Sequence, residues 1–95
     1  MTPDTFPPYR ALFFRRHALR QMARLHLTDN DIDELLGRGG ILEQYPDGTG
    51  CLVAGTLRGR TLHAVMARPG KGSEAVVIAV FEPAAGQENA PEAGA

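Results

Sequence analysis

The first regular pattern of apolar and polar positions runs from about residue 14 to residue 26. At 100° per residue, one broad face of a helix collects five apolar side chains, namely Phe14, Ala18, Leu19, Met22 and Leu25. The opposite face carries the arginine row, which we define as Arg16, Arg20 and Arg24. His17 and Gln21 lie on the flank beside this row. The pattern predicts a first helix with one buried face and one basic face.

A second helix is predicted over residues 28–37, and its start is well marked. Thr28 is a good N-cap, and Asp31 completes a capping-box-like pair three residues later. Leu27 and Ile32 flank the cap with the spacing of a hydrophobic staple. A glycine-rich stretch then ends the helix. The acidic run "DNDIDE" therefore indicates a helix start. It lacks the glycine and the later glutamate of a calcium-binding loop.

After residue 40 the helical spacing gives way to alternation, which indicates β-strands. Four apolar runs are separated by short turn sequences, at residues 41–45, 51–57, 60–68 and 74–83. "RG" at Arg58 and Gly59 predicts a two-residue hairpin turn. The last run is apolar on both faces, so we expect it in the centre of the sheet or covered on both sides. The predicted fold class is α+β, with two N-terminal helices packed on a four-stranded antiparallel sheet.

The length of 95 residues fits one small domain. We expect an N-terminal extension over residues 1–12, a single domain over 13–83 and a disordered tail over 84–95, which has no large apolar residue. No apolar run is long enough to span a membrane, and the start does not resemble a signal peptide, so no membrane partner is expected. The single cysteine, Cys51, cannot form an internal disulfide, and the cytoplasm is the expected location.

The net charge of −1 hides a basic segment. No acidic residue lies between Asp4 and Asp29, and this stretch holds five of the ten basic residues. Like charges four positions apart on a helix repel one another, so the arginine row is either a solvated face or a site for an anionic partner. The histidines and the cysteine lack the spacing of zinc ligands, and no phosphate-binding glycine loop precedes a helix. No metal or cofactor is therefore expected.

Three segments, in order, carry motifs of a known family. They are "RRHALRQMARLHLTDNDIDELL", "GRTLHAVMA" and "AVVIAVFEP". Together they resemble the domain-of-unknown-function 4258 family over roughly residues 13–83. That family is similar to the barnase/RelE-like superfamily, which includes small ribonucleases and toxins of toxin–antitoxin pairs. The resemblance implies a RelE/barnase-like fold, RNA as a partner, and an acidic antitoxin or other protein as a second partner.

The resemblance also points to particular residues. His17 matches the family's histidine before Ala-Leu, and His63 matches its Leu-His on a strand. Four positions depart from the family pattern: Gln21 and Leu25 replace arginines, and Ala79 and Phe81 replace a threonine and a tyrosine. Two of the missing groups are hydroxyls that could serve a reaction. The departures therefore favour binding over catalysis, although the fold is unaffected.

Two functions remain open from the sequence. Metal-free RNA cleavage needs a base, an acid and cations around the phosphate, and histidine can fill either proton-transfer role. His17 and His63 would be that pair, with the arginine row and Gln21 holding the phosphate. The alternative is a non-catalytic binding module that docks an acidic protein or a nucleic-acid backbone on the arginine row. A plainly structural domain is the third interpretation, and for His63 a half-buried strand position is the simpler one.

Overall fold

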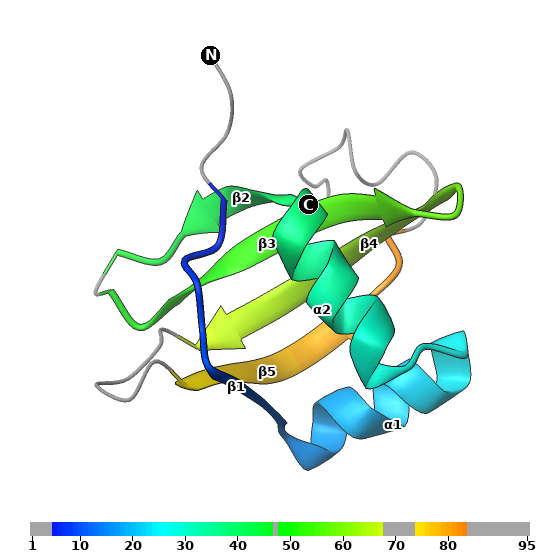
Figure 1. The fold of residues 1–95 in the computed structure, drawn as a ribbon. Helices are drawn as coiled ribbons and strands as arrows, with labels where there is room; N and C mark the ends of the chain where they lie inside the picture. Colours follow the sequence, from blue (N-terminus) through cyan, green and yellow to red (C-terminus); the bar gives the residue numbers. More distant parts are fainter. Residues whose placement is uncertain (1–4, 47, 68–73, 84–95) are drawn as a thin grey trace, which may run out of the picture.

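The computed structural model describes residues 5–46, 48–67 and 74–83. The elements of this part are, in order, β1 (Ala11–Phe14), α1 (Arg16–Leu25), α2 (Asp29–Arg38), β2 (Gly40–Gln44), β3 (Gly50–Leu57), β4 (Arg60–Ala67) and β5 (Glu74–Phe81) (Figure 1). The turn predicted between β4 and β5, part of the turn before β3, and the predicted disordered tail lie outside the described residues.

The sheet has five strands in the order β1-β5-β4-β3-β2, and it is mixed because β1 runs parallel to β5. The prediction of four antiparallel strands was therefore wrong, and the missed element is β1. In β1, Leu12 and Phe14 pack towards the core whereas Phe13 is exposed. This alternation spans only four residues, and Phe14 also fits the helical spacing that follows it. The short strand was therefore absorbed into the predicted first helix and the extension before it.

Helix α1 begins two residues later than predicted, at Arg16, and ends at Leu25. His26 ends it in the left-handed conformation, with a φ of 59°. Ala18 and Met22 are buried as expected, but the side chain of Leu19 is 50% exposed and lies off the buried face. The apolar face of α1 is therefore narrower than the sequence pattern indicated.

Helix α2 starts as predicted from the sequence. The Thr28 hydroxyl accepts a hydrogen bond from the Asp31 backbone N–H at 3.2 Å, and the Asp31 carboxylate accepts one from the Thr28 backbone N–H at 2.8 Å. This reciprocal capping box confirms the expected N-cap. The helix packs on β3, where Gly55 leaves room for Leu35: a Cβ on Gly55 would lie 2.9 Å from the Leu35 Cδ1 atom.

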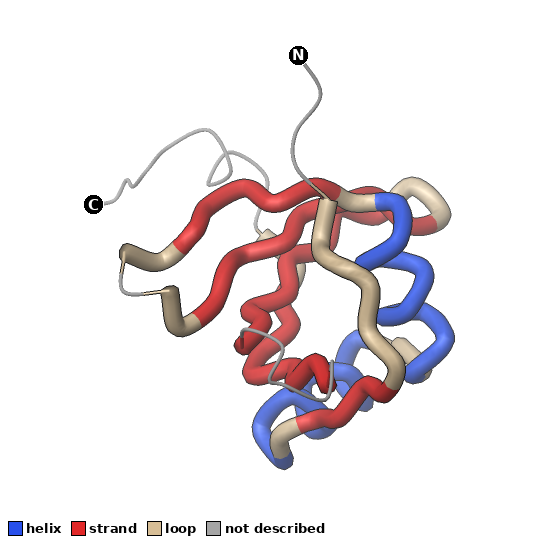
Figure 2. The backbone as a smooth tube through the Cα atoms, turned by 60° about the vertical axis from the view of Figure 1, so that its left-hand side comes forward, coloured by secondary structure: helices blue, strands red, loops and turns tan. Residues whose placement is uncertain are grey.

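Both helices lie on one side of the sheet (Figure 2), and residues 5–10 cross the strands on that same side (Figure 1). Phe6 from this segment is buried in the core, and the Tyr9 hydroxyl donates a hydrogen bond to Asp33 of α2. Strand β5 lies inside the sheet, as expected from its apolar sequence. Within the described residues its second face is not covered, because Ile78 and Phe81 are exposed.

Three local features complete the sheet. Arg58 and Gly59 both have positive φ, at 48° and 81°, which confirms the predicted two-residue turn between β3 and β4. Strand β5 carries an extra residue, Ile78, between the residues paired with Val65 and Met66. Strand β2 carries an extra residue, Leu42, in the same way. These β-bulges change which side chains face the core.

Candidate functional site

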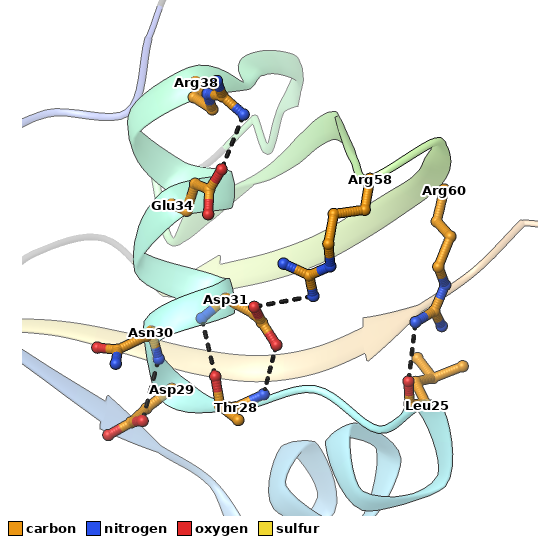
Figure 3. Close-up of polar contacts among 9 residues, drawn as sticks. All are labelled: Leu25, Thr28, Asp29, Asn30, Asp31, Glu34, Arg38, Arg58 and Arg60. Atoms are coloured by element: carbon orange, nitrogen blue, oxygen red, sulfur yellow. Dashed lines mark hydrogen bonds and ion pairs between the residues drawn. The ribbon is translucent and has the colours of Figure 1, made fainter.

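Helix α1 lies along the outer edge of β5 and runs in the same direction. At its start, the Arg15 backbone N–H donates to the Val77 carbonyl at 2.9 Å. At its end, the Arg60 Nη1 atom donates to the Leu25 carbonyl at 3.0 Å, while the Nε atom of Arg60 lies 3.4 Å from the Glu82 carboxylate (the Arg60–Leu25 bond is drawn in Figure 3). The helix is therefore held beside β5 from Val77 to the end of the strand.

A glutamine fixes the middle of α1 to β5. Strand β1 pairs with β5 only as far as Val77, so the next outward-facing N–H of β5 has no strand partner. The side-chain oxygen of Gln21 accepts a hydrogen bond from the Val80 N–H at 2.7 Å and takes the place of that partner. Gln21 thus has a structural contact, and the predicted role of its side chain in phosphate binding stays a prediction.

This contact orients the basic surface of α1. Residues three and four positions from Gln21 lie on the same flank of the helix, so His17 and Arg24 also lie along the edge of β5. Arg16, Arg20 and Arg24 are all exposed. Successive arginines are separated by about 6 Å along the helix axis, at a rise of about 1.5 Å per residue. The row therefore offers three separate cationic groups over about 12 Å.

The acidic residues of α2 do not neutralise this row. Each has another contact: Asp31 with Arg58 at 3.0 Å, Glu34 with Arg38 at 2.7 Å, Asp29 with the backbone N–H of Asn30 at 3.0 Å, and Asp33 with Tyr9 (the first three in Figure 3). The backbone N–H of Thr28 and the guanidinium of Arg58 hold the pKa of Asp31 below its ordinary value. Among the described residues, none forms an ion pair with the arginine row.

The two histidines predicted as an acid–base pair lie on different elements. His17 is exposed on α1 between Arg16 and Arg20. His63 is half-buried on β4, where its ring meets the Phe81 ring edge-on at 5.2 Å between centroids. Because α1 follows one edge of β5 and β4 pairs with the other, β5 lies between the two histidines. The structure therefore brings His17 together with the arginines, and not with His63.

Sequence reasoning missed Arg60 and Tyr9. Arg60 donates a hydrogen bond to the carbonyl of Leu25, the last residue of α1, a role for which basic residues are suited, and Tyr9 ties residues 5–10 to α2. Burial, with help from Asp33, raises the pKa of Tyr9 well above its ordinary value. Neither role has a local sequence signal, because both partners lie more than 20 positions away.

The remaining candidate chemistry is limited. Cys51 is buried, and its burial raises the pKa of the thiol, which keeps it protonated and unreactive. In the described ranges, no group of three histidine, cysteine, aspartate or glutamate side chains could hold a metal ion. Neither of the helices in that part of the chain has the length and hydropathy to cross a bilayer.

Comparisons with known proteins address the family of the chain. Curated proteins and solved structures gave no match. A family model, described as a domain of unknown function (DUF4258), matches residues 14–82. The match covers both helices, four of the five strands, and the surface that carries His17 and the arginine row. The resemblance that the sequence motifs indicated is thereby confirmed, and the chain belongs to the DUF4258 family.

Proposed function

We propose that this domain binds RNA through its phosphate backbone on the arginine row of α1. One observation carries the proposal: three exposed arginines lie on one ridge, while the acids of the neighbouring helix are engaged elsewhere. Guanidinium groups hold phosphates with two parallel hydrogen bonds, which favours arginine over lysine at such a site. The motifs also led us to expect a similarity of the family to barnase/RelE-like proteins, and such a similarity would support the proposal.

Salt dependence tests the proposal. Three phosphate contacts on a single strand correspond to a slope of about −2 in a plot of log K against log salt. Affinity should therefore fall roughly 15- to 20-fold between 50 and 200 mM salt. We would measure the anisotropy of a labelled RNA oligonucleotide across this range. The double reversal Arg20→Glu and Arg24→Glu should abolish binding without unfolding the domain.

A matched control distinguishes the effect of the arginine row on RNA affinity from the effect of net charge. The single reversal Arg20→Glu is compared with Arg10→Glu, which makes the same change in net charge at an exposed position outside the row. This control should bind RNA nearly as well as the wild type. Polyglutamate tests the alternative partner, an acidic protein segment. If polyglutamate competes as well as RNA of equal charge, or if the row variant binds normally, the proposal is wrong.

RNA cleavage is a second candidate function, supported by the position of His17 between two arginines of the row. In this reaction His17 would take the proton of a 2′-hydroxyl, whose oxygen attacks the adjacent phosphorus. The bond to the 5′ oxygen breaks, and that oxygen takes up a proton from water. His17→Ala should abolish cleavage of labelled RNA and retain binding. His26→Asn, at an exposed histidine whose left-handed conformation asparagine tolerates, is the matched control.

A further inference from the structure

A strip of exposed apolar side chains follows β1 and β5. We define the apolar strip as Phe13, Ile78 and Phe81, whose exposed fractions are 50%, 38% and 37%. Phe13 pairs with Val76 and Phe81 pairs with His63, so both rings lie on the sheet face away from the helices. Ile78 is the extra residue of the β-bulge between them. The strip therefore comprises three exposed apolar side chains on two neighbouring strands.

The apolar strip runs beside the arginine row. Val76, the β5 partner of Phe13, lies five positions before Phe81, which corresponds to about 17 Å along the strand. The row spans about 12 Å on α1, which follows the outer edge of the same strand. The strip lies on the face of β5, and the row lies beyond its edge. A cationic line and an apolar aromatic line thus run together over a similar length.

The combination of the arginine row and the apolar strip favours one kind of ligand. Exposed aromatic rings stack with nucleobases, and proteins that bind single-stranded nucleic acids combine such rings with basic groups that follow the backbone. A duplex turns its bases inward, so it could engage only the arginines. An unpaired strand presents phosphates on one side and bases on the other, which matches the two lines.

We infer that the apolar strip stacks the unpaired bases of a single-stranded RNA whose phosphates lie on the arginine row. This inference rests on the proposed function and specifies its substrate class. His63 contributes by position, because its edge-on contact with Phe81, at an interplanar angle of 69°, supports that ring from the β4 side. At the bulge, Ile78 is exposed whereas Val77 and Val80 on either side remain buried in the core.

The test compares a single-stranded RNA with a fully paired RNA duplex that has the same number of phosphates. Phe81→Leu and Phe13→Leu keep apolar side chains but remove the rings, so the fold should survive, and unchanged thermal unfolding would verify this. Each variant should bind the single strand roughly 5- to 150-fold more weakly, with the same salt slope as the wild type. The wild type should bind the duplex more weakly than the single strand, and neither variant should change the affinity for the duplex.

Leu42→Ala is the matched control, because Leu42 is 61% exposed and lies on β2 at the opposite edge of the sheet. It should bind both RNAs as the wild type does. Equal affinity for the two RNAs, or wild-type binding by both ring variants, overturns the inference. If the Arg20 and Arg24 reversal still abolishes binding in that case, the proposed function survives. Phe81-dependent self-association in sedimentation would assign the strip to a second copy of the chain and also overturn the inference.

Discussion

Replacing Gln21 with alanine removes the side-chain oxygen that accepts a hydrogen bond from the Val80 N–H. The N–H is partly buried against α1, so losing its partner should cost about 1–3 kcal/mol. Alanine is a slightly better helix former than glutamine, and this offsets a few tenths of a kcal/mol of the loss in the free energy of unfolding. The free energy of unfolding should therefore fall by about 1–2 kcal/mol. For a domain of this size, that lowers the Tm by roughly 5–15 °C.

The chain has no tryptophan, so far-UV circular dichroism in urea and during heating is the suitable measurement. Gln44→Ala on β2 is the control, because this glutamine is exposed and its side chain has no such contact with the backbone of another described element. A loss below about 0.5 kcal/mol in Gln21→Ala would show that water replaces the glutamine and would refute the argument.

A second substitution at the same position separates stability from binding. Gln21→Glu keeps an oxygen that can accept the Val80 N–H, so the Tm should stay near that of the wild type. Its negative charge lies beside His17 and Arg24 on the same flank, so RNA affinity should fall. Gln21→Ala should show the opposite pair of results, with lower stability and an unchanged salt slope. If the two variants behave alike, Gln21 does not act as the structure indicates.

Three further changes test other parts of the fold. The raised pKa of Tyr9 means that its contribution to stability is full below about pH 10 and is lost above it, so the advantage of wild type over Tyr9→Phe in urea unfolding should vanish at high pH. The pKa of Asp31 is lowered, first by the Thr28 N–H, so the contribution of Asp31 to stability is present above about pH 4 and is lost as the pH falls further. The free energy of unfolding of Asp31→Asn should therefore be lower than that of the wild type at pH 7, and the difference should disappear in acid. Gly50→Ala should destabilise by about 1–3 kcal/mol or more, because a Cβ there would lie 2.1 Å from the Met66 carbonyl oxygen; a wild-type Tm would contradict the close approach.

The features that could be predicted from the sequence are those set by neighbouring residues. The capping box of Thr28 and Asp31, the turn at Arg58 and Gly59, and the exposed arginine row all depend on spacings of a few positions. Such spacings are visible in one sequence because helices and turns have fixed geometry.

The features that could not be predicted depend on distant partners. Gln21 and Val80 are 59 positions apart, and a glutamine that caps a strand edge has no local pattern. Whether the arginine row was paired depended on where Tyr9, Arg38 and Arg58 placed the acids of α2. The separation of His17 from His63 followed from β5 lying between α1 and β4, which only the strand order reveals.

The two edge strands of the sheet affect how the molecule associates with other chains. An exposed strand edge is a template on which a foreign strand can add, and long flat edges promote aggregation. Here one edge is only four residues long, and the other is interrupted by the extra residue Leu42. Neither edge offers a long uninterrupted ladder of backbone groups. Strand addition at either edge of the sheet is thereby disfavoured, and the face of the sheet and the flank of α1 remain as the surfaces for specific recognition.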